Sequence, residues 1–329
     1  MTLGILLTRR AHLKILSPVI EAALGRGHAT IVVADVRAAK RGDQLDLREV
    51  ARLYPRVRIE STGIYGKLDA LIGVDATLPD LKTIRVVGVD HFYDAWTYYP
   101  RRSANRVMAY HSEFHRDTHA SLWDVAPGGE VVGWLPADQM LAAMCHTSGQ
   151  RDCVVFFALK LNVPEPWRNS REGRQFYKAI AYAAKAKAHA DGLRFVVKSR
   201  KKHGDPLWLR WMADEYVLDE SMVPYTSLSL LARAKWCVHF ESGCVWESAL
   251  MGCYSYAIQV PQTHIIDLPG GRLQYGGVPM HDWPGVAQYG LPQGVILTSA
   301  TQRAKYLEHF VGACDGRAGE RVVQLAEGG

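Results

Sequence analysis

The sequence predicts an α/β protein with two domains, in each of which buried strands alternate with helices. Short apolar runs that end in polar residues recur along both halves of the chain, and amphipathic or Ala-rich helical segments separate several of them. Apolar runs of this kind are typical of parallel strands that are buried on both faces. The length of 329 residues suits two domains of about 150 residues better than one small core.

The first domain is expected over residues 1–147 and begins with a strand, a helix and a second strand. Residues 3–8 are an apolar run, and residues 12–24 carry leucines and an isoleucine at helical spacing before a Gly-rich stop. A second strand follows over 30–34. Four further strands are expected near 57–60, 70–73, 84–89 and 107–110.

The second domain is expected over residues 148–329, after a linker within 146–152. It begins with the apolar strand 153–158, and a loop that contains Pro164 and Pro166 follows. The elements expected after this loop are a helix over about 171–190, strands at 194–198 and 216–219, a helix at 228–234, an apolar strand at 234–238 and a last helix at about 300–313.

Composition indicates a soluble globular protein. The sequence is 48% hydrophobic and 22% charged, and it has no apolar run of 18 or more residues. The apolar start before Arg9 is too short for a signal peptide, so a cytoplasmic protein is expected. The six cysteines have no paired metal spacing, and we expect them to be reduced and to bind no metal. The net charge of +6 suits anionic partners without selecting one class of them.

The most informative segment runs from His239 to Glu247. An apolar strand precedes it, Ser242 and Gly243 permit a tight turn, and a helix is expected from Val245. The free N–H groups of such a helix N-terminus attract a phosphate, whereas a carboxylate one turn later suits the hydroxyls of a ribose. The simpler alternative is an ordinary strand-turn-helix with a buried His and a solvated Glu.

This segment resembles the donor-nucleotide site of GT-B glycosyltransferases, especially the UDP-glycosyltransferase superfamily. In that family a His and a Gly-rich turn hold the diphosphate, and a Glu eight residues after the His holds the ribose. His239 and Glu247 have this spacing, and Gln262 follows a Pro where the family has a sugar-contacting residue. The resemblance implies diphosphate contacts from His239, Ser242, Gly243 and Cys244.

The fold that this resemblance implies is two Rossmann-like domains facing one another across a cleft. The first domain would bind the acceptor, the second would bind the nucleotide sugar, and the last helix would cross back toward the first domain. The loop that contains Val223 would cradle the nucleobase. No Asp-x-Asp motif occurs in the sequence, which fits the metal-independent chemistry of this fold.

Two local departures favour other branches of the same fold. Glu241 stands where the family usually has a small residue, and Glu241-Ser242-Gly243 resembles the Asp-Ser-Gly of non-hydrolysing UDP-sugar 2-epimerases. Lys198 and Arg200 begin a basic cluster that resembles a segment of the CDP-glycerol glycerophosphotransferases. Such side chains clamp phosphate oxygens, although a solvated basic loop is an equal alternative.

The catalytic base is expected among His12, Asp90 and His91. His12 lies sixteen residues before His28, the spacing that the resembled family shows between its base and the His of its Gly-His pair, but the His-x-x-Pro of that family is absent. His12 would otherwise be a simple residue at a helix start. Asp90 and His91 follow an apolar strand, at the strand end where α/β sheets place their chemistry. An imidazole can remove the proton of an acceptor hydroxyl near neutral pH.

The acceptor is expected to contact a stretch that combines aromatics with arginines, namely Trp96, Tyr98, Arg101 and Arg102. Such side chains can stack bases and neutralise phosphates, so a hydroxymethylated base in viral DNA is one candidate acceptor. A cell-envelope glycan or an anionic lipid would suit the same composition.

These observations together predict a metal-independent glycosyltransferase that moves a hexosyl or pentosyl group from a nucleotide sugar, UDP-linked by preference, to an acceptor hydroxyl. No cofactor beyond the donor is expected. A UDP-sugar 2-epimerase and a non-catalytic module that binds nucleotides or nucleic acid are the alternatives.

Overall fold

The chain forms two compact units in a computed structural model. The residues that the structure describes are 1–35, 44–90, 105–122, 128–144, 149, 151–158, 170–199, 205–218, 223, 225–240, 244–258, 265–268, 271–274, 278–279 and 300–328. Unit 1 comprises Met1–Ala142, Met222–Pro224 and Glu308–Gly329, and unit 2 comprises Ala143–Ser221 and Tyr225–Leu307. Unit 2 is therefore inserted, along the sequence, into unit 1.

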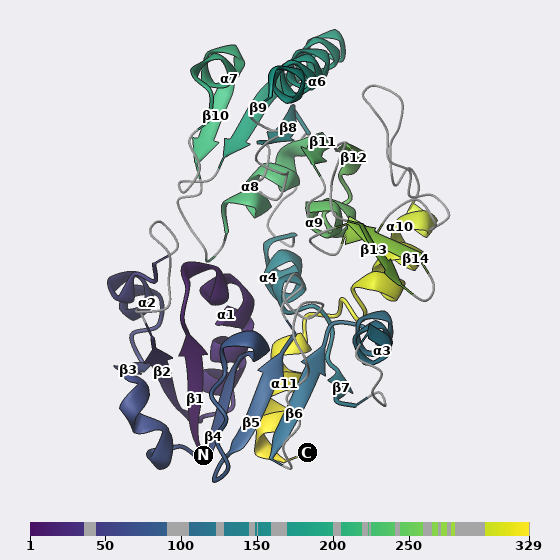
Figure 1. The fold of residues 1–329 in the computed structure, drawn as a ribbon. Coiled ribbons are helices and arrows are strands. Elements are labelled where there is room, and N and C mark those ends of the chain that lie inside the picture. Colours follow the sequence, from purple (N-terminus) through teal and green to yellow (C-terminus); the bar gives the residue numbers. More distant parts are fainter. Residues whose placement is uncertain are drawn as a thin grey trace. The chain divides into compact units, whose positions relative to one another are not determined.

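Unit 1 is organised around a seven-stranded parallel sheet (Figure 1), with the strand order β3-β2-β1-β4-β5-β6-β7. Its central strands are apolar and almost completely buried, as expected for strands covered on both faces. The strands are β1 Thr2–Leu7, β2 Ala29–Ala34, β3 Arg58–Glu60, β4 Ala70–Val74, β5 Arg85–Val89, β6 Arg106–Tyr110 and β7 Glu130–Val131.

Helices cover this sheet, and the first of them pairs with the last. The helices are α1 Arg10–Gly25, α2 Leu47–Leu53, α3 Glu113–Leu122, α4 Leu135–Met144 and α11 Ala318–Glu327, with the short 3-10 turns η2 Thr62–Lys67 and η3 Asp75–Thr77. Helix α11 contributes Val322 and Val323 to the same core as Leu13 and Leu16 of α1.

The pairing of α1 with α11 depends on a glycine. A Cβ atom on Gly319 would lie 2.4 Å from the backbone oxygen of Pro18, so the two helix backbones meet where α11 has no side chain. The carboxylate of Asp138, from α4, accepts hydrogen bonds from the backbone N–H groups of Ala318 and Gly319. It thus satisfies two of the donors that every helix start leaves unpaired.

Unit 2 contains a five-stranded parallel sheet with the order β10-β9-β8-β11-β12. Its strands are β8 Cys153–Phe157, β9 Arg194–Ser199, β10 Glu215–Leu218, β11 Ala234–Phe240 and β12 Tyr254–Ile258. Its helices are α6 Arg171–Ala190, α7 Leu207–Met212, α8 Thr226–Arg233 and α9 Cys244–Leu250. A small antiparallel sheet joins β13 Ile265–Leu268, β14 Gly271–Gln274 and β15 Val278–Pro279. Helix α10 Ala300–Phe310 carries the chain from unit 2 into unit 1.

The core of unit 2 lies between its sheet and the helices α6 and α7. Phe156, Phe195 and Phe240 pack there with Tyr177 of α6 and Leu209 of α7. Because alternate residues of a strand point to opposite faces, Trp236, Val238 and Phe240 of β11 belong to this core, whereas His239 points to the other face.

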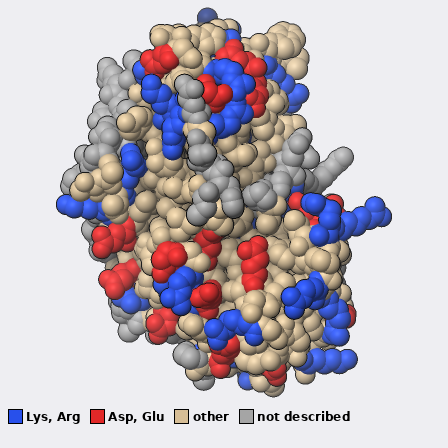
Figure 2. Space-filling model, turned by 180° about the vertical axis from the view of Figure 1, so that it is seen from behind, with Lys and Arg blue, Asp and Glu red and all other residues tan. Residues whose placement is uncertain are grey.

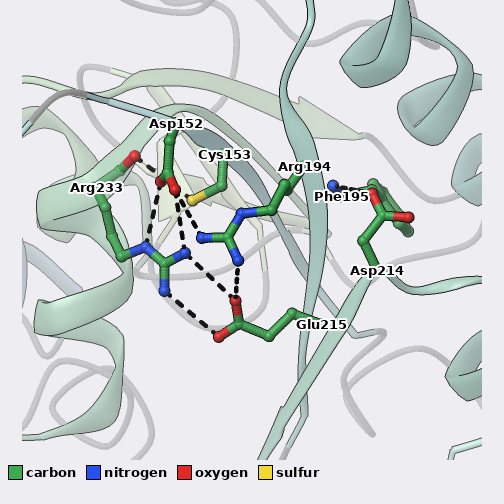
Figure 3. Close-up of polar contacts among 7 residues, drawn as sticks. All are labelled: Asp152, Cys153, Arg194, Phe195, Asp214, Glu215 and Arg233. Carbon is green, nitrogen blue, oxygen red and sulfur yellow. Dashed lines mark hydrogen bonds and ion pairs between the residues drawn. The ribbon is translucent and has the colours of Figure 1, made fainter.

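The amino ends of the unit 2 strands are tied together by an ion-pair network (Figure 3). Asp152 pairs with Arg194 at 2.6 Å and with Arg233 at 3.3 Å, and Glu215 pairs with the same two arginines at 3.3 Å. Beside this network, burial and the Asp152 carboxylate raise the pKa of the Cys153 thiol to about 12, so this cysteine stays protonated. This end of the sheet therefore has a structural role.

The described surface mixes both signs of charge. On the face in Figure 2, Lys and Arg side chains lie among Asp and Glu side chains, in agreement with the small net charge of +6. None of the described helices combines the length and the apolar character that crossing a membrane requires.

Candidate functional site

His12 and Asp90 lie at the same edge of the unit 1 sheet. His12 is in the first turn of α1, which follows β1, and Asp90 directly follows β5. Because β4 alone separates β1 from β5, these two strand ends are about 10 Å apart. Both side chains are buried, and Nδ1 of His12 lies 3.3 Å from Oγ1 of Thr8.

Asp90 lies within a group of buried histidines. Its Oδ2 is 3.0 Å from Nδ1 of His115 in α3, and the His115 ring lies 5.2 Å from that of His111, which follows β6. His119, one turn further along α3, has its Nδ1 2.9 Å from the hydroxyl oxygen of Tyr110. Ser112 is also buried, and its hydroxyl donates to the backbone oxygen of Phe310.

The histidines keep Asp90 ionised. Burial is the largest influence on its pKa and acts to raise it, since a charge is costly away from water. The hydrogen bond from His115 and the charges of His111, His115 and His119 together outweigh burial, so the pKa of Asp90 is lowered from its usual 3.8. Asp90 is thus a carboxylate held in place at the carboxyl edge of the sheet.

The His239 segment lies at the corresponding edge of unit 2. His239, near the end of β11, is fully buried, and its Nε2 is 2.8 Å from the hydroxyl oxygen of Ser255 in β12. This contact orients the ring across the two strands. The imidazole is thereby fixed next to the point where the chain leaves the sheet for α9.

Glu247 is in the first turn of α9 and is 6% exposed. Tyr225, at the start of α8, is buried close to it. Burial raises the pKa of the Tyr225 hydroxyl well above its ordinary value of 10.0, and the nearby Glu247 carboxylate and the Cys244 thiol raise it further. A carboxylate, a phenol and a thiol therefore share one buried environment at the carboxyl edge of the sheet.

Two other expected donor ligands have quite different surroundings. Lys198, the last but one residue of β9, has a buried side chain whose Nζ is 6.0 Å from the ring centre of Phe157. Val223 is partly buried against the core of unit 1 rather than that of unit 2. The structure therefore brings Cys244 and Glu247 close to Tyr225, while Val223 belongs to the other unit.

Several expected site residues lie outside the residues that the structure describes. These are the base candidate His91, the donor ligands Ser242, Gly243, Gln262 and Arg200, and the acceptor contacts Trp96, Tyr98, Arg101 and Arg102. Their roles remain predictions.

The sequence interpretation did not include the histidines around Asp90, although the sequence carries a signal for them. His111, His115 and His119 recur at intervals of four residues, the spacing that places side chains on one face of a helix. Within the described ranges, no group of three or more His, Cys, Asp or Glu side chains has the arrangement of a metal site.

Comparison with solved structures identifies the architecture. The wall teichoic acid polymerase TagF superposes with a TM-score of 0.61 at 8% identity, over 100% of this chain and 88% of that one. UDP-GlcNAc 2-epimerase from Methanocaldococcus jannaschii gives 0.52 at 13% identity, over 100% of both chains. A putative UDP-N-acetylglucosamine 2-epimerase from Listeria monocytogenes gives 0.52 at 12% identity, over 99% of this chain and 95% of that one.

The fold is GT-B. The two parallel sheets with their covering helices and the full-length superpositions agree on this point, and the resemblance noted in the sequence is confirmed at the level of the fold. No protein-family model matches the sequence, and no curated protein matches it. At identities of 8–14%, the solved structures establish the GT-B architecture alone. The chemistry has to be inferred from the residues of this chain.

Proposed function

We propose that this protein is a glycosyltransferase that uses a nucleotide-sugar donor, UDP-linked by preference, with unit 2 as the donor-binding unit. The observation that carries the proposal is Glu247, a buried carboxylate in the first turn of the helix that follows β11. In α/β folds, ligands bind beyond the carboxyl ends of the strands. A carboxylate at that position can accept hydrogen bonds from both hydroxyls of a ribose.

The diphosphate would lie closer to the helix start than the ribose. Backbone N–H groups of Ser242, Gly243 and Cys244 would donate to its oxygens, at the positive end of the α9 dipole. His239, fixed by Ser255, would hold the end of β11 in register with this turn. These donors would stabilise the negative charge that develops on the leaving nucleotide, which is commonly the largest contribution to catalysis.

Unit 1 would supply the base. His12 lies at the carboxyl edge of the unit 1 sheet, where an imidazole could take the proton from an acceptor hydroxyl. Asp90, kept ionised by its histidines, is the alternative base or the group that orients one. His12→Asn and Asp90→Asn should each leave nucleotide binding unchanged, and loss of turnover in one variant identifies the residue that acts.

A UDP-sugar 2-epimerase is the second candidate. It is favoured by Glu241-Ser242-Gly243 and by full-length likeness to epimerases, one of which was solved with UDP-GlcNAc and UDP. An epimerase needs no acceptor. NMR of a UDP-sugar incubated with the protein alone distinguishes the two, because an epimerase produces the second epimer and a transferase does not.

Nucleotide binding is the first test of the proposal. UDP, CDP, GDP, ADP and dTDP are added to the wild type and to Glu247→Gln, and thermal stability is measured. At a nucleotide concentration of 100 times Kd, binding stabilises the folded protein by about 2.7 kcal/mol, which the Glu247→Gln variant should largely lose.

Glu215→Gln is the matched control, since it removes a carboxylate at the opposite end of the same sheet. Selective stabilisation by one nucleotide in the wild type and in the control, but not in Glu247→Gln, supports the proposal. An equal shift in all three proteins would show that Glu247 does not bind the ribose, and no shift with any nucleotide would refute a nucleotide-sugar donor.

A further inference from the structure

A group of aromatic and aliphatic side chains lies exposed on unit 2, away from the carboxyl edge described above. Leu207 is 60% exposed, Trp211 80% and Tyr182 51%. Trp208 stacks on Tyr182, with ring centres 6.4 Å apart and planes within 10°. We refer to Tyr182, Leu207, Trp208 and Trp211 as the aromatic patch.

The aromatic patch is continuous. On the helix α7, residues 207, 211 and 208 fall within an arc of about 100°, while Leu209 and Met212 point into the core. Trp208 also contacts Tyr177 of α6 edge-on at 5.6 Å, so α6 and α7 lie side by side (Figure 1) and bring Tyr182 next to the α7 stripe. The core of unit 2 buries Leu209 and Met212 and partly buries Trp208, but Tyr182, Leu207 and Trp211 remain exposed.

Basic side chains surround the aromatic patch. Nζ of Lys178 lies 5.8 Å from the centre of the Tyr182 ring, and Arg210 of α7 lies over Tyr216 at 5.1 Å. Helix α6 carries five Lys or Arg residues against the single acid Glu172. Lys185 and Lys187 of α6 pair with Asp214 and Asp191, respectively, and Asp205 accepts a hydrogen bond from Tyr216. The positive charges beside the patch are therefore those of Lys178 and Arg210.

The size of the aromatic patch argues against a stable protein interface. At their observed exposures, Leu207, Trp211 and Tyr182 together present roughly 400 Å², because a whole large side chain of this kind has only about 150–250 Å² to bury. A stable protein interface buries roughly 800 Å² on each partner. A few Trp, Tyr and Leu side chains beside basic residues are enough, by contrast, to attach a protein to the headgroup region of an anionic bilayer.

We propose that the aromatic patch docks this protein on an anionic lipid surface. Leu207 and Trp211 insert at the boundary between headgroups and acyl chains, Tyr182 and Trp208 lie at headgroup level, and Lys178 and Arg210 face the lipid phosphates. The attachment is peripheral and reversible. It is independent of the nucleotide donor and holds whichever reaction unit 2 serves.

The test is co-sedimentation of the whole chain with vesicles of phosphatidylcholine alone, or of phosphatidylcholine with about one-third phosphatidylglycerol. We expect binding to the anionic vesicles that weakens with salt. The double variant Leu207→Ser/Trp211→Ser should lower the apparent affinity about tenfold or more, because both inserted apolar groups are lost. Lys178→Glu should lower it by a smaller factor.

Tyr254→Ser is the matched control, because Tyr254 is an exposed aromatic, 39% accessible, on β12 of the same unit and outside the patch. It should bind vesicles like the wild type. A melting temperature of the double variant close to that of the wild type shows that the loss is not caused by unfolding. Vesicle binding and nucleotide binding are measured in separate experiments. The lipid-docking proposal and the glycosyltransferase proposal can therefore fail independently.

Three results would overturn the proposal. One is no binding of the wild type to anionic vesicles. Another is equal binding by the wild type and the double variant. The third is a wild type that does not bind vesicles but self-associates or binds a single-stranded oligonucleotide, while the double variant does neither. The patch would then bind a second copy of the chain or nucleic acid.

Discussion

Asp90 is kept ionised by histidines that reach it from α3 and from the end of β6. Because its folded pKa is lowered below 3.8, the carboxylate stabilises the native state fully above about pH 3.8. This contribution is lost as the pH falls from that value through the lower folded pKa.

Asp90→Asn tests this linkage. At pH 7 we expect the variant to lose about 3 kcal/mol in the free energy of unfolding, since buried imidazoles lose their charged partner. The difference from the wild type should shrink when the pH is lowered through and below 3.8. Urea unfolding at pH 7 and pH 3 measures it, and a difference that does not depend on pH would contradict this account.

A buried ion pair and a surface ion pair should differ in how much they stabilise the folded protein. The guanidinium of Arg106 donates to Asp75 with both side chains almost fully buried, and Gly88 has no side chain where the Asp75 carboxylate lies. Asp152 forms its pairs at the surface.

We expect Asp75→Asn to cost about 3–5 kcal/mol and Asp152→Asn less than about 1 kcal/mol. Urea unfolding at low and high salt compares them, because only the exposed pair should depend on salt. A similar cost for both would mean that burial of the Asp75 pair does not set its energy.

At the scale of single residues, the sequence indicates candidates but not their partners. Glu247 is a candidate because its spacing from His239 is local. The surroundings of Asp90 could not be predicted, since His115 lies 25 residues away and approaches only when β6 and α3 are in place. The proximity of Tyr225 to Glu247 likewise depends on how α8 and α9 pack.

Helix α11 depends on the close approach of Gly319 to Pro18. Gly319→Ala would force its Cβ atom against a backbone oxygen that cannot move freely. We expect a loss of about 1–3 kcal/mol. Gly25→Ala is the control in the facing helix, because a Cβ there meets nothing within 4 Å.

The control should be neutral or stabilise the protein by about 0.4–1 kcal/mol, through the lower entropy of the unfolded chain. Thermal unfolding compares the two variants. Equal effects of both substitutions would show that the contact between α1 and α11 is less close than described.

Elements were predictable where burial leaves a continuous pattern. The strands expected near 3–8, 30–34, 57–60, 70–73, 84–89 and 107–110 are confirmed as β1 to β6. Most of them are apolar runs, as is typical of parallel strands covered on both faces, whereas β3 is a short edge strand with exposed and half-buried residues. The helix expected near 300–313 corresponds to α10. Helix α11 was not anticipated: its ten residues bury Val322, Val323, Leu325 and Ala326 against a partner about 300 residues earlier in the sequence.

The two units of the molecule have separate hydrophobic cores. A change in one unit should therefore shift the unfolding transition of that unit. Differential scanning calorimetry should show that Gly319→Ala lowers the transition of unit 1, whereas a bound nucleotide raises that of unit 2, because a ligand stabilises the state that holds it. Glu247→Gln should abolish the second effect and leave the first. A single transition that responds to both changes would show that the units unfold together.

The order of the chain through the two units sets the order in which they can mature during translation. All of unit 2 leaves the ribosome before Ala318, so its sheet and helices can assemble on the nascent chain. Most of unit 1 is synthesised first, yet the part of α1 that packs on α11 has no partner until α11 has been synthesised.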